Sequence, residues 1–160
     1  TAAHKGFNPE DISMPEAQQY RAKKEPIYNH SIHDYAPLYI QPKNPMLYFL
    51  KEKQSDLCLL KVDINILRSD KFLFTDGNAA SRATKFYKSS SDVDKIPVEV
   101  LEADYWNDIE DGKRKRCAEV LIHPSIPTKY INTIHCFNQK TMNKLSYLNI
   151  DTQVSKKMYF

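Results

Sequence analysis

A single carboxylate interrupts one of the most apolar segments of the chain. Residues 117–124 read CAEVLIHP, which predicts a strand, and Glu119 is its only acidic residue. Side chains alternate between the two faces of a strand, so Glu119 points away from the face shared by Ala118 and Val120. If its face borders a cleft, the carboxylate is partly desolvated, which is unfavourable unless it has a partner or a catalytic role. If its face borders water, Glu119 is an ordinary edge-strand residue, and position alone leaves both readings open.

Cations are concentrated directly before this segment. Residues 113–116 read KRKR, and smaller groups occur at residues 23–24 and at Lys43. The net charge of +3 and the pI near 8.6 are common among soluble enzymes, so they do not by themselves indicate a nucleic-acid partner. A run of four cations is most often a solvated loop, with a phosphate contact as the alternative. Its place beside Glu119 favours the phosphate contact.

A third candidate segment is rich in aromatic residues and proline. Residues 33–49 read HDYAPLYIQPKNPMLYF, with Tyr35, Tyr39 and Tyr48 spaced along it. Tyrosines of this kind are more often core residues with a bonded hydroxyl, but beside a cation such as Lys43 they can also stack on bases. His33 and Asp34 would point to opposite faces of a strand, so they do not form a catalytic pair.

Composition excludes several kinds of site. The chain has three glycines and no GxGxxG or GxxxxGK[ST] loop, so it does not hold a nucleotide in either of those cradles. Its three cysteines lie far apart without metal-ligand spacing, and we expect free thiols in the core, as suits a reducing cytoplasm. No apolar window of about 18 residues and no signal peptide is apparent. We therefore expect a cytoplasmic protein without a metal site and without membrane contact.

The elements that must position these residues follow an irregular order. The patterns predict the following elements: helices over 15–24, 78–89, 97–108 and 138–147; a bent or edge strand over 33–42; a short helix or extended segment over 44–53; strands over 56–64, 71–76, 117–124 and within 127–138; and a weak last strand in the tail. Strands and helices do not alternate as βαβ units. We therefore expect an α+β fold with a mixed, mostly antiparallel sheet in a single domain of residues 1–160.

Four of these segments together resemble the DarT family of DNA ADP-ribosyltransferases. HDYAPLYIQPKNPMLYFL at 33–50 is similar to the family stretch HDYVPFYFxPRSPMLY, and FTDGNA at 74–79 resembles the FTD that opens the family's substrate loop. KRKRCAEVLIH at 113–123 looks like the family's basic segment followed by QAEFLV, and the terminal MYF resembles WYF or WYY. The four occur in the family's order and span roughly residues 15–160.

The resemblance implies an ADP-ribosyltransferase fold, with a split β-sheet and short flanking helices, that transfers ADP-ribose from NAD to a base in single-stranded DNA. Thymine is favoured over guanine as that base. Glu119 and Arg21 match the family's catalytic residues. The NAD-binding element falls at about residues 8–23, with Ala17 and Arg21 as contacts, and the substrate-recognition loop runs from about Asn78 to Glu119. The implied DNA-binding residues are Tyr39, Lys43, Met46, Asn78, Arg114 and Arg116.

The same resemblance implies a biological setting. It predicts a toxin or antiphage effector, acting as a monomer, whose partner is an antitoxin with a macrodomain that hydrolyses the modification from DNA. NAD is expected as a co-substrate.

The sequence departs from the family pattern at three places. Nothing matches the family's first strand, HITHxxNL, so we expect the chain to begin just after that strand and to bind NAD weakly by itself. Pro42-Lys43-Asn44 replaces a proline-arginine-serine turn, which exchanges a bidentate guanidinium for a point charge. Asn78 stands where the family often has histidine, which leaves the recognised base open.

Two other functions compete with DNA modification. A degenerate transferase fold without activity would serve as a module that binds single-stranded nucleic acid. Transfer of ADP-ribose to protein is disfavoured, because Cys117 stands where an ExE or QxE pair has its first member.

Overall fold

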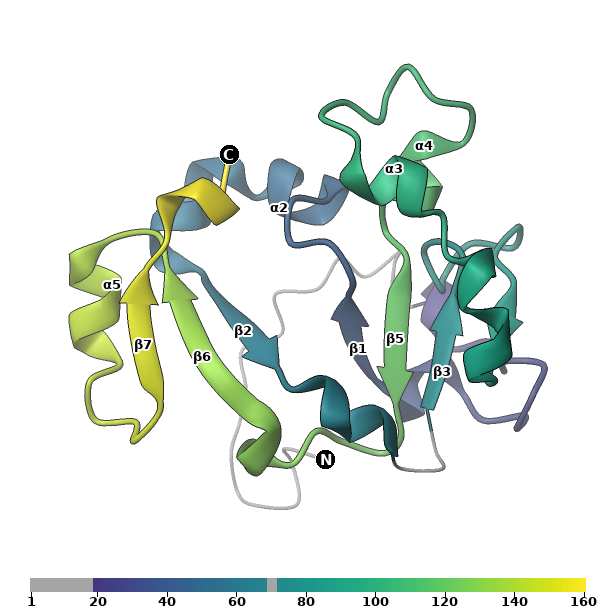
Figure 1. The fold of residues 1–160 in the computed structure, drawn as a ribbon, viewed down its shortest axis with the longest axis horizontal. Coiled ribbons are helices and arrows are strands. Elements are labelled where there is room, and N and C mark those ends of the chain that lie inside the picture. Colours follow the sequence, from purple (N-terminus) through teal and green to yellow (C-terminus); the bar gives the residue numbers. More distant parts are fainter. Residues whose placement is uncertain (1–18, 69–71) are drawn as a thin grey trace.

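The strands form two sheets that lie side by side (Figure 1). The computed structural model describes residues 19–68 and 72–160. The first sheet contains β1 (Ala36–Tyr39), β5 (Glu119–Ile122), β3 (Phe72–Thr75) and β4 (Phe86–Tyr87), in that order, with every pair antiparallel. The second contains β2 (Cys58–Val62), β6 (Ile131–Cys136) and β7 (Asp151–Val154); β2 runs antiparallel to β6, and β7 parallel to it. The predicted α+β fold with a split, mostly antiparallel sheet is confirmed.

The helices are short and lie around the sheets. The α-helices that the structure describes in full are α2 (Pro45–Phe49), α3 (Val98–Glu102), α4 (Gly112–Lys115) and α5 (Gln139–Lys144). The 3-10 helices are Ile32–Asp34, Lys51–Asp56, Ile64–Arg68, Ser90–Lys95, Thr128–Tyr130 and Lys156–Met158. Figure 1 shows α5 beside β7, and α2, α3 and α4 together at one end of the sheets. Asn44 begins α2 because its side chain accepts the backbone N–H groups of Met46 and Leu47.

The sequence overestimated three helices. The predicted helix over 78–89 is wrong: this stretch consists of turns that lead into β4. The Asn78 and Ser81 side chains accept the N–H groups of Ala80 and Ala83, which replaces helical hydrogen bonding there. The helix over 97–108 ends at Glu102, since Ala103 is extended. The helix over 138–147 is α5, which ends at Lys144.

The core beneath the first sheet lies on the same face of β5 as Glu119. It is formed by the buried residues Ile32, Tyr35, Leu73, Ala79 and Leu121. Leu121 sits in the central strand, opposite Pro37 of β1 on one side and Leu73 of β3 on the other. Because it is fully buried, Leu121→Ala would destabilise the fold by about 2–5 kcal/mol. This packing fixes β5, and therefore Glu119, in place.

The cysteines do not all behave as predicted. Cys117 and Cys136 are buried, but Cys58, on the edge strand β2, is exposed and lines the larger cleft described below. All three are free thiols, and burial raises the pKa of Cys117 to about 12. Within residues 19–68 and 72–160, no helix is both long and apolar enough to cross a membrane.

Candidate active site

Glu119 is buried at the start of the central strand of the first sheet, with none of its surface exposed. Its backbone N–H donates to the Thr75 hydroxyl of β3 at 3.0 Å. Its carboxylate accepts the backbone N–H of Ala79 at 3.0 Å on Oε1 and the guanidinium of Arg21 at 3.3 Å on Oε2. Both carboxylate oxygens therefore have a donor. The edge-strand reading of Glu119 is excluded, and the reading as a buried, partnered carboxylate holds.

Arg21 reaches this carboxylate from the other end of the chain. It ends the described part of the predicted 15–24 helix, where residues 19–21 are helical. Both Nη1 and Nη2 lie 3.3 Å from Oε2 of Glu119, and the Arg21 side chain is 18% exposed. The structure thus brings together the two residues that the resemblance paired, with the arginine between the carboxylate and the solvent.

The protonation of Glu119 depends on this pairing. Burial raises the pKa of the Glu119 carboxyl above its ordinary value, while the charge of Arg21 and the Ala79 N–H lower it in part. A buried carboxylate is charged only where such donors offset its lost hydration. Arg21 is the larger of the two stabilising influences.

A second buried glutamate supports the segment that follows Arg21. Glu25 is 1% exposed, and its carboxylate accepts the N–H groups of Ile27, Tyr28 and His30. Burial alone would raise the pKa of Glu25, but these bonds outweigh it and the pKa lies below its ordinary value. Sequence reasoning missed this residue, because one glutamate between a lysine and a proline carries no pattern that indicates such a role.

The HDY motif anchors that same segment. The Tyr35 hydroxyl donates to Oε1 of Glu25 at 3.0 Å, and Ser31 and Asp34 bond each other's backbone as a capping box. Burial and the Glu25 carboxylate raise the pKa of Tyr35, so its hydroxyl stays a donor. Tyr35 is a core residue with a bonded hydroxyl, which was the more common of the two readings.

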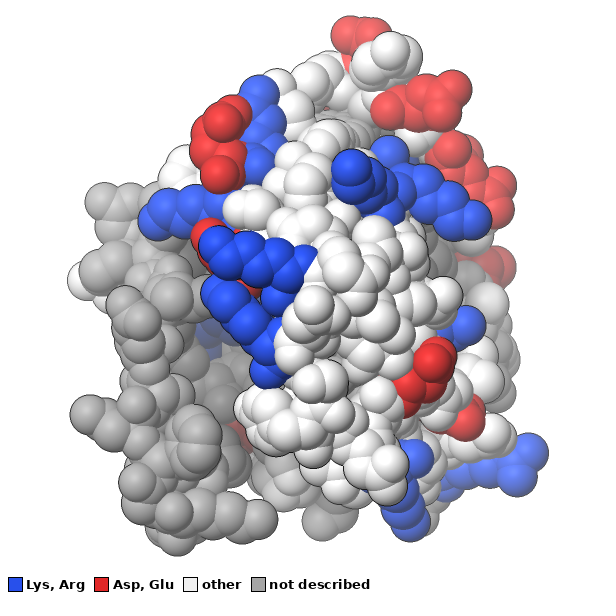
Figure 2. All heavy atoms as spheres, turned by 90° about the vertical axis from the view of Figure 1, so that its left-hand side faces the viewer, with Lys and Arg blue, Asp and Glu red and all other residues white. Residues whose placement is uncertain are grey.

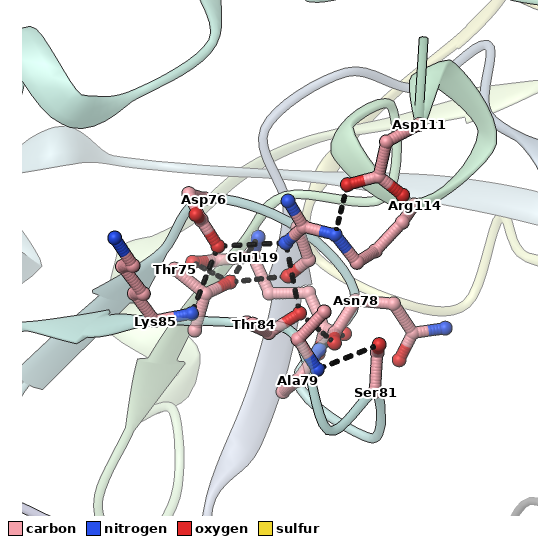
Figure 3. Close-up of polar contacts among 12 residues, drawn as sticks. Thr75, Asp76, Asn78, Ala79, Ser81, Thr84, Lys85, Asp111, Arg114 and Glu119 are labelled. Atoms are coloured by element: carbon pink, nitrogen blue, oxygen red, sulfur yellow. Dashed lines mark hydrogen bonds and ion pairs between the residues drawn. The ribbon is translucent and has the colours of Figure 1, made fainter.

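The loop between β3 and β4, residues 76–85, supplies the amide that bonds Glu119 (Figure 3). Asn78 and Ser81 shape its turns, and the Thr84 hydroxyl donates to the Asn78 carbonyl at 2.6 Å. Arg114 from α4 lies against the loop, where its Nη1 donates to Asp76 at 2.7 Å. This loop is therefore part of the frame around Glu119.

A pocket of about 630 Å³ lies beside the Glu119 frame. Its apolar lining comes from Tyr39, Pro45, Met46, Phe49 and Cys117, and its polar lining from Asn78, Ser81, Asp111, Lys113 and Arg114. Tyr39 pairs with Glu119 across β1 and β5. Burial and the Glu119 charge raise the pKa of the Tyr39 hydroxyl, which therefore remains a donor. Aromatic and thioether surfaces combined with a few polar groups suit a flat, polar-edged ligand such as a nucleobase.

Four of the six predicted DNA-binding residues line this pocket: Tyr39, Met46, Asn78 and Arg114. The guanidinium of Arg114 is nevertheless occupied by two carboxylates, Asp76 at 2.7 Å and Asp111 at 2.5 Å. The Lys43 ammonium lies over the Phe160 ring at 5.8 Å, so its predicted DNA contact stays a prediction.

The surroundings of Arg116 disfavour its predicted contact with DNA. Arg116 is 4% exposed, and its guanidinium donates at 2.7–2.8 Å to backbone carbonyls of Lys43, Val100, Leu101 and Ala103. It also lies over the Trp106 ring at 5.0 Å. Four bonds to carbonyls explain why a cation is tolerated inside the protein. Arg116 joins the end of α3 to the segment before α2 and is not available to phosphate.

Several other predictions fall elsewhere. Ala17 and residues 1–14 lie outside the described residues. A larger cleft of about 840 Å³ is lined by β1, β2 and β6, mainly with aliphatic side chains, of which Leu60 and Ile64 are exposed. Among the residues that the structure describes, no group of three or more His, Cys, Asp or Glu is arranged to hold a metal ion.

Basic residues are not confined to the pocket. Figure 2 views the side formed by α5 and β7, where cationic side chains are spread over the face and acidic ones lie mainly toward its upper and right-hand edges. Lys144 lies in α5, and Lys156 and Lys157 lie in the 3-10 helix that follows β7. Charge alone therefore does not locate a nucleic-acid site on this molecule.

Known proteins resemble this chain over most of its length. A "DNA ADP-ribosyl transferase-DNA ADP-ribosyl glycohydrolase fusion protein" of Thermosipho africanus is 36% identical over 121 residues, which cover 73% of this chain and 31% of the relative. A "DNA ADP-ribosyl transferase" of Thermus sp. is 26% identical over 118 residues, which cover 68% of this chain and 56% of the relative. The chain thus spans about a third to somewhat over half of the length of these curated relatives.

Solved structures agree in fold. The structure of Thermosipho africanus DarTG in complex with ADP-ribose superposes with a TM-score of 0.86 at 28% identity, covering 99% of this chain and 44% of that one. The structure of Thermus sp. 2.9 DarT in complex with ADP-ribosylated ssDNA gives a TM-score of 0.85 at 20% identity, covering 98% of this chain and 85% of that one. The family model described as "ssDNA thymidine ADP-ribosyltransferase, DarT" matches residues 1–160, and this chain belongs to the DarT family.

Proposed function

We propose that this chain transfers ADP-ribose from NAD to a base in single-stranded DNA, with thymine as the favoured base. The observation that carries the proposal is the buried Glu119 carboxylate, which is paired with Arg21 at 3.3 Å and lies beside a pocket of about 630 Å³. The names of the relatives, and the ADP-ribosylated DNA bound to the Thermus sp. 2.9 protein, support the same chemistry.

The reaction develops positive charge on a ribose. The bond between C1′ and the nicotinamide nitrogen breaks, its electron pair leaves with nicotinamide, and a ring nitrogen of the base bonds to C1′ and loses its proton. The transition state resembles the oxocarbenium ion of glycoside hydrolysis. We assign Glu119 to the ribose 2′-hydroxyl, because a fixed carboxylate there bonds more strongly as the charge grows.

Arg21 has an electrostatic role in this scheme. A guanidinium keeps its proton near neutral pH and is a poor base, so we do not assign it the proton of the acceptor base. It keeps Glu119 ionised, and it can also stabilise the NAD phosphates or the anion of a deprotonated ring nitrogen. Its side chain is the more exposed of the pair, at 18% against 1% for Glu119, which suits a group that meets the substrate.

The acceptor base fits the pocket bounded by Tyr39, Met46 and Asn78. A base stacked in a duplex does not reach such a site without unpairing at a cost of a few kcal/mol, so single-stranded DNA is the better substrate. For the phosphates we propose Lys113 and Lys43. Lys113 is exposed and lines the pocket, whereas the guanidinium of Arg114 is held by Asp76 and Asp111.

We further propose that the modification is reversed by a glycohydrolase partner, since the Thermosipho africanus relative is named as a fusion of a transferase with a DNA ADP-ribosyl glycohydrolase. A chain that modifies DNA in this way would act as a toxin or antiphage effector in the cytoplasm, and we propose that it acts as a monomer. NAD contacts by Ala17 remain a prediction from the resemblance.

The decisive experiment incubates the protein with NAD and short single-stranded oligonucleotides and measures the DNA by mass spectrometry. We expect one ADP-ribose to be added to oligonucleotides that contain thymine, and none with Glu119→Gln or without NAD. A matched set in which every thymine is replaced tests the base. Binding of the oligonucleotide without any modification, by a protein that also binds NAD, would replace this proposal with that of a non-catalytic binding module.

A further inference from the structure

The loop at residues 76–85 contacts Glu119 and the segment that carries Arg21. Its Ala79 N–H donates to Oε1 of Glu119 at 3.0 Å. On its other side, the Ser81 carbonyl accepts the Lys23 ammonium at 2.7 Å, two residues after Arg21. The position of this loop therefore sets how the carboxylate and the arginine segment face each other.

Arg114 fixes the loop at several points, as Figure 3 shows. Its Nη1 donates to Asp76 at 2.7 Å and to the Thr84 hydroxyl at 3.1 Å, near the two ends of the loop. Its backbone carbonyl accepts the Asn78 N–H at 3.0 Å. The Arg114 side chain thus links the two ends of the loop, and its backbone carbonyl holds Asn78, the residue before Ala79.

Asp111 and Gly77 hold the Arg114 side chain in its orientation. Asp111, at the start of α4, accepts from Nε at 2.5 Å. Gly77 also lies against Arg114, since a Cβ at residue 77 would stand 2.9 Å from the Arg114 carbonyl and closer still to its guanidinium. Contacts below 3.0 Å with a backbone atom are not tolerated, so residue 77 must lack a side chain for Arg114 to lie where it does.

We infer that Arg114 is a positioning residue, which holds the loop at residues 76–85 so that the Ala79 amide and the Lys23 contact fix Glu119 opposite Arg21. The importance of this role for catalysis rests on the proposed function. The contacts of Arg114 with the loop are independent of that function. A primary role in binding phosphate is disfavoured, because the Arg114 side chain is 12% exposed and two carboxylates balance its charge.

The first test needs no substrate. Amide hydrogen exchange measured by NMR compares the wild type with Arg114→Lys, Arg114→Ala and Asp76→Asn. We expect the Ala79 and Asn78 amides to exchange at least about 10-fold faster in each variant, with amides of β6 unchanged. We also expect a higher pKa for the Glu119 carboxyl, read from its side-chain carbon shift, because the Ala79 N–H lowers it. Unchanged Ala79 exchange and an unchanged Glu119 pKa in the folded variants would overturn the inference.

The second test separates positioning from DNA contact. We expect Arg114→Ala to lower kcat at saturating DNA about 10-fold or more, to leave the salt dependence of DNA binding unchanged, and to move the acid limb of the pH profile upward. Lys113→Ala is the comparison and should raise KM for DNA and flatten the salt dependence. A loss confined to KM with a flatter salt dependence in Arg114→Ala would show a phosphate contact instead. If Arg114→Ala does not fold, Asp76→Asn weakens the same bond from the other side, because it removes the charge of the acceptor. If no variant and no wild type modifies DNA, the proposed function fails, and the exchange measurement still decides the positioning role.

Discussion

Arg21 and Glu119 lie 98 positions apart in the sequence, and the guanidinium of the first donates two hydrogen bonds of 3.3 Å to one oxygen of the second. The other oxygen accepts the Ala79 amide. An ionised carboxylate offers about four acceptor sites, so Glu119 has capacity for a ribose hydroxyl without losing either partner. The pair therefore represents a carboxyl group that is already oriented before substrate arrives.

Replacement of Glu119 by glutamine should separate chemistry from folding. The amide keeps the shape of the side chain, removes its charge and leaves one of its two donors, Arg21 or Ala79, without an acceptor. The transferase rate should fall about 100- to 1,000-fold or more, while the lost bond costs about 1–3 kcal/mol, or roughly 2–12 °C in unfolding temperature. Rates come from oligonucleotide mass spectrometry and stability from thermal unfolding. A variant whose activity loss is explained by its loss of folded protein would indicate a structural role only.

The rate should depend on pH through Glu119. Burial raises the pKa of this carboxyl above its ordinary value, and the reaction needs the ionised form. Activity should therefore rise with pH along an acid limb whose midpoint lies above the ordinary glutamate value. Arg21→Gln removes the main influence that lowers this pKa, so the midpoint should move further upward, and kcat should also fall at its plateau. An acid limb that stays in place in Arg21→Gln would show that another group titrates.

The same shift has a consequence for stability, and its sign is the reverse of the usual carboxylate case. The folded state binds the Glu119 proton more tightly than the unfolded chain, so this contribution to stability is complete below the unfolded pKa. It is lost as pH rises from that value through the folded pKa. In Glu119→Gln this loss should disappear, which unfolding curves measured across that window will reveal as a flatter pH dependence than that of the wild type.

Arg116→Ala should destabilise the protein without changing the salt dependence of its binding to single-stranded DNA. Removal of the guanidinium takes a donor from the carbonyls of Lys43, Val100 and Ala103, while the Leu101 carbonyl keeps the Gln41 amide at 2.7 Å. The cost is on the order of 3 kcal/mol, or roughly 6–12 °C in unfolding temperature. Binding to a single-stranded oligonucleotide, measured well below that temperature, should keep the wild-type salt slope. Lys113→Ala is the matched control, with an unchanged unfolding temperature and a slope lower by about one. A lower salt slope in Arg116→Ala, with an unchanged slope in Lys113→Ala, would show that Arg116 contacts phosphate.

Glu25→Gln tests the support behind Arg21. An amide has one acceptor oxygen where the carboxylate has two, so at least one of the N–H groups of Ile27, Tyr28 and His30 loses its acceptor, at a cost of about 1–3 kcal/mol. Because the folded pKa of Glu25 is lowered, its contribution is present above the unfolded pKa and is lost as pH falls through the folded value. The difference in stability between wild type and variant should therefore shrink in acid. A difference that stays constant with pH would mean that Glu25 is not the group involved.

The sequence predicted most strands because their signal is local. Alternating apolar residues over 56–64, 71–76 and 117–124 correspond to β2, β3 and β5. The helix over 78–89 was wrong, since Asn78 and Ser81 bond the backbone of their own loop, and a pattern of apolar residues does not reveal that competition. Helices in this fold are stabilised at their ends and by long-range contacts, so their lengths were overestimated.

The candidate site was predicted only in part. Glu119 stood out as a carboxylate in an apolar strand, but its pairing with Arg21 came from the resemblance, because no local pattern links residues 98 positions apart. Within the run at 113–116 the sequence did not distinguish the cation that faces the pocket from the cations that bond the protein. That distinction depends on acceptors supplied by distant segments, namely Asp76 for Arg114 and the carbonyls around α3 for Arg116.

Neighbouring residues of the basic run at 113–116 have different contacts, and this limits which insertions and deletions the run tolerates. Successive residues of a helix are turned by about 100°, so inserting or deleting one residue in α4 would rotate every cation to a neighbour's direction. Lysine would then stand where the forked donors of Arg114 or Arg116 are required, and a point charge does not replace them. Lys113, in contrast, is exposed and needs only its charge. Selection on this stretch should therefore preserve its length and its two arginines strictly, while Lys113 is free to become arginine.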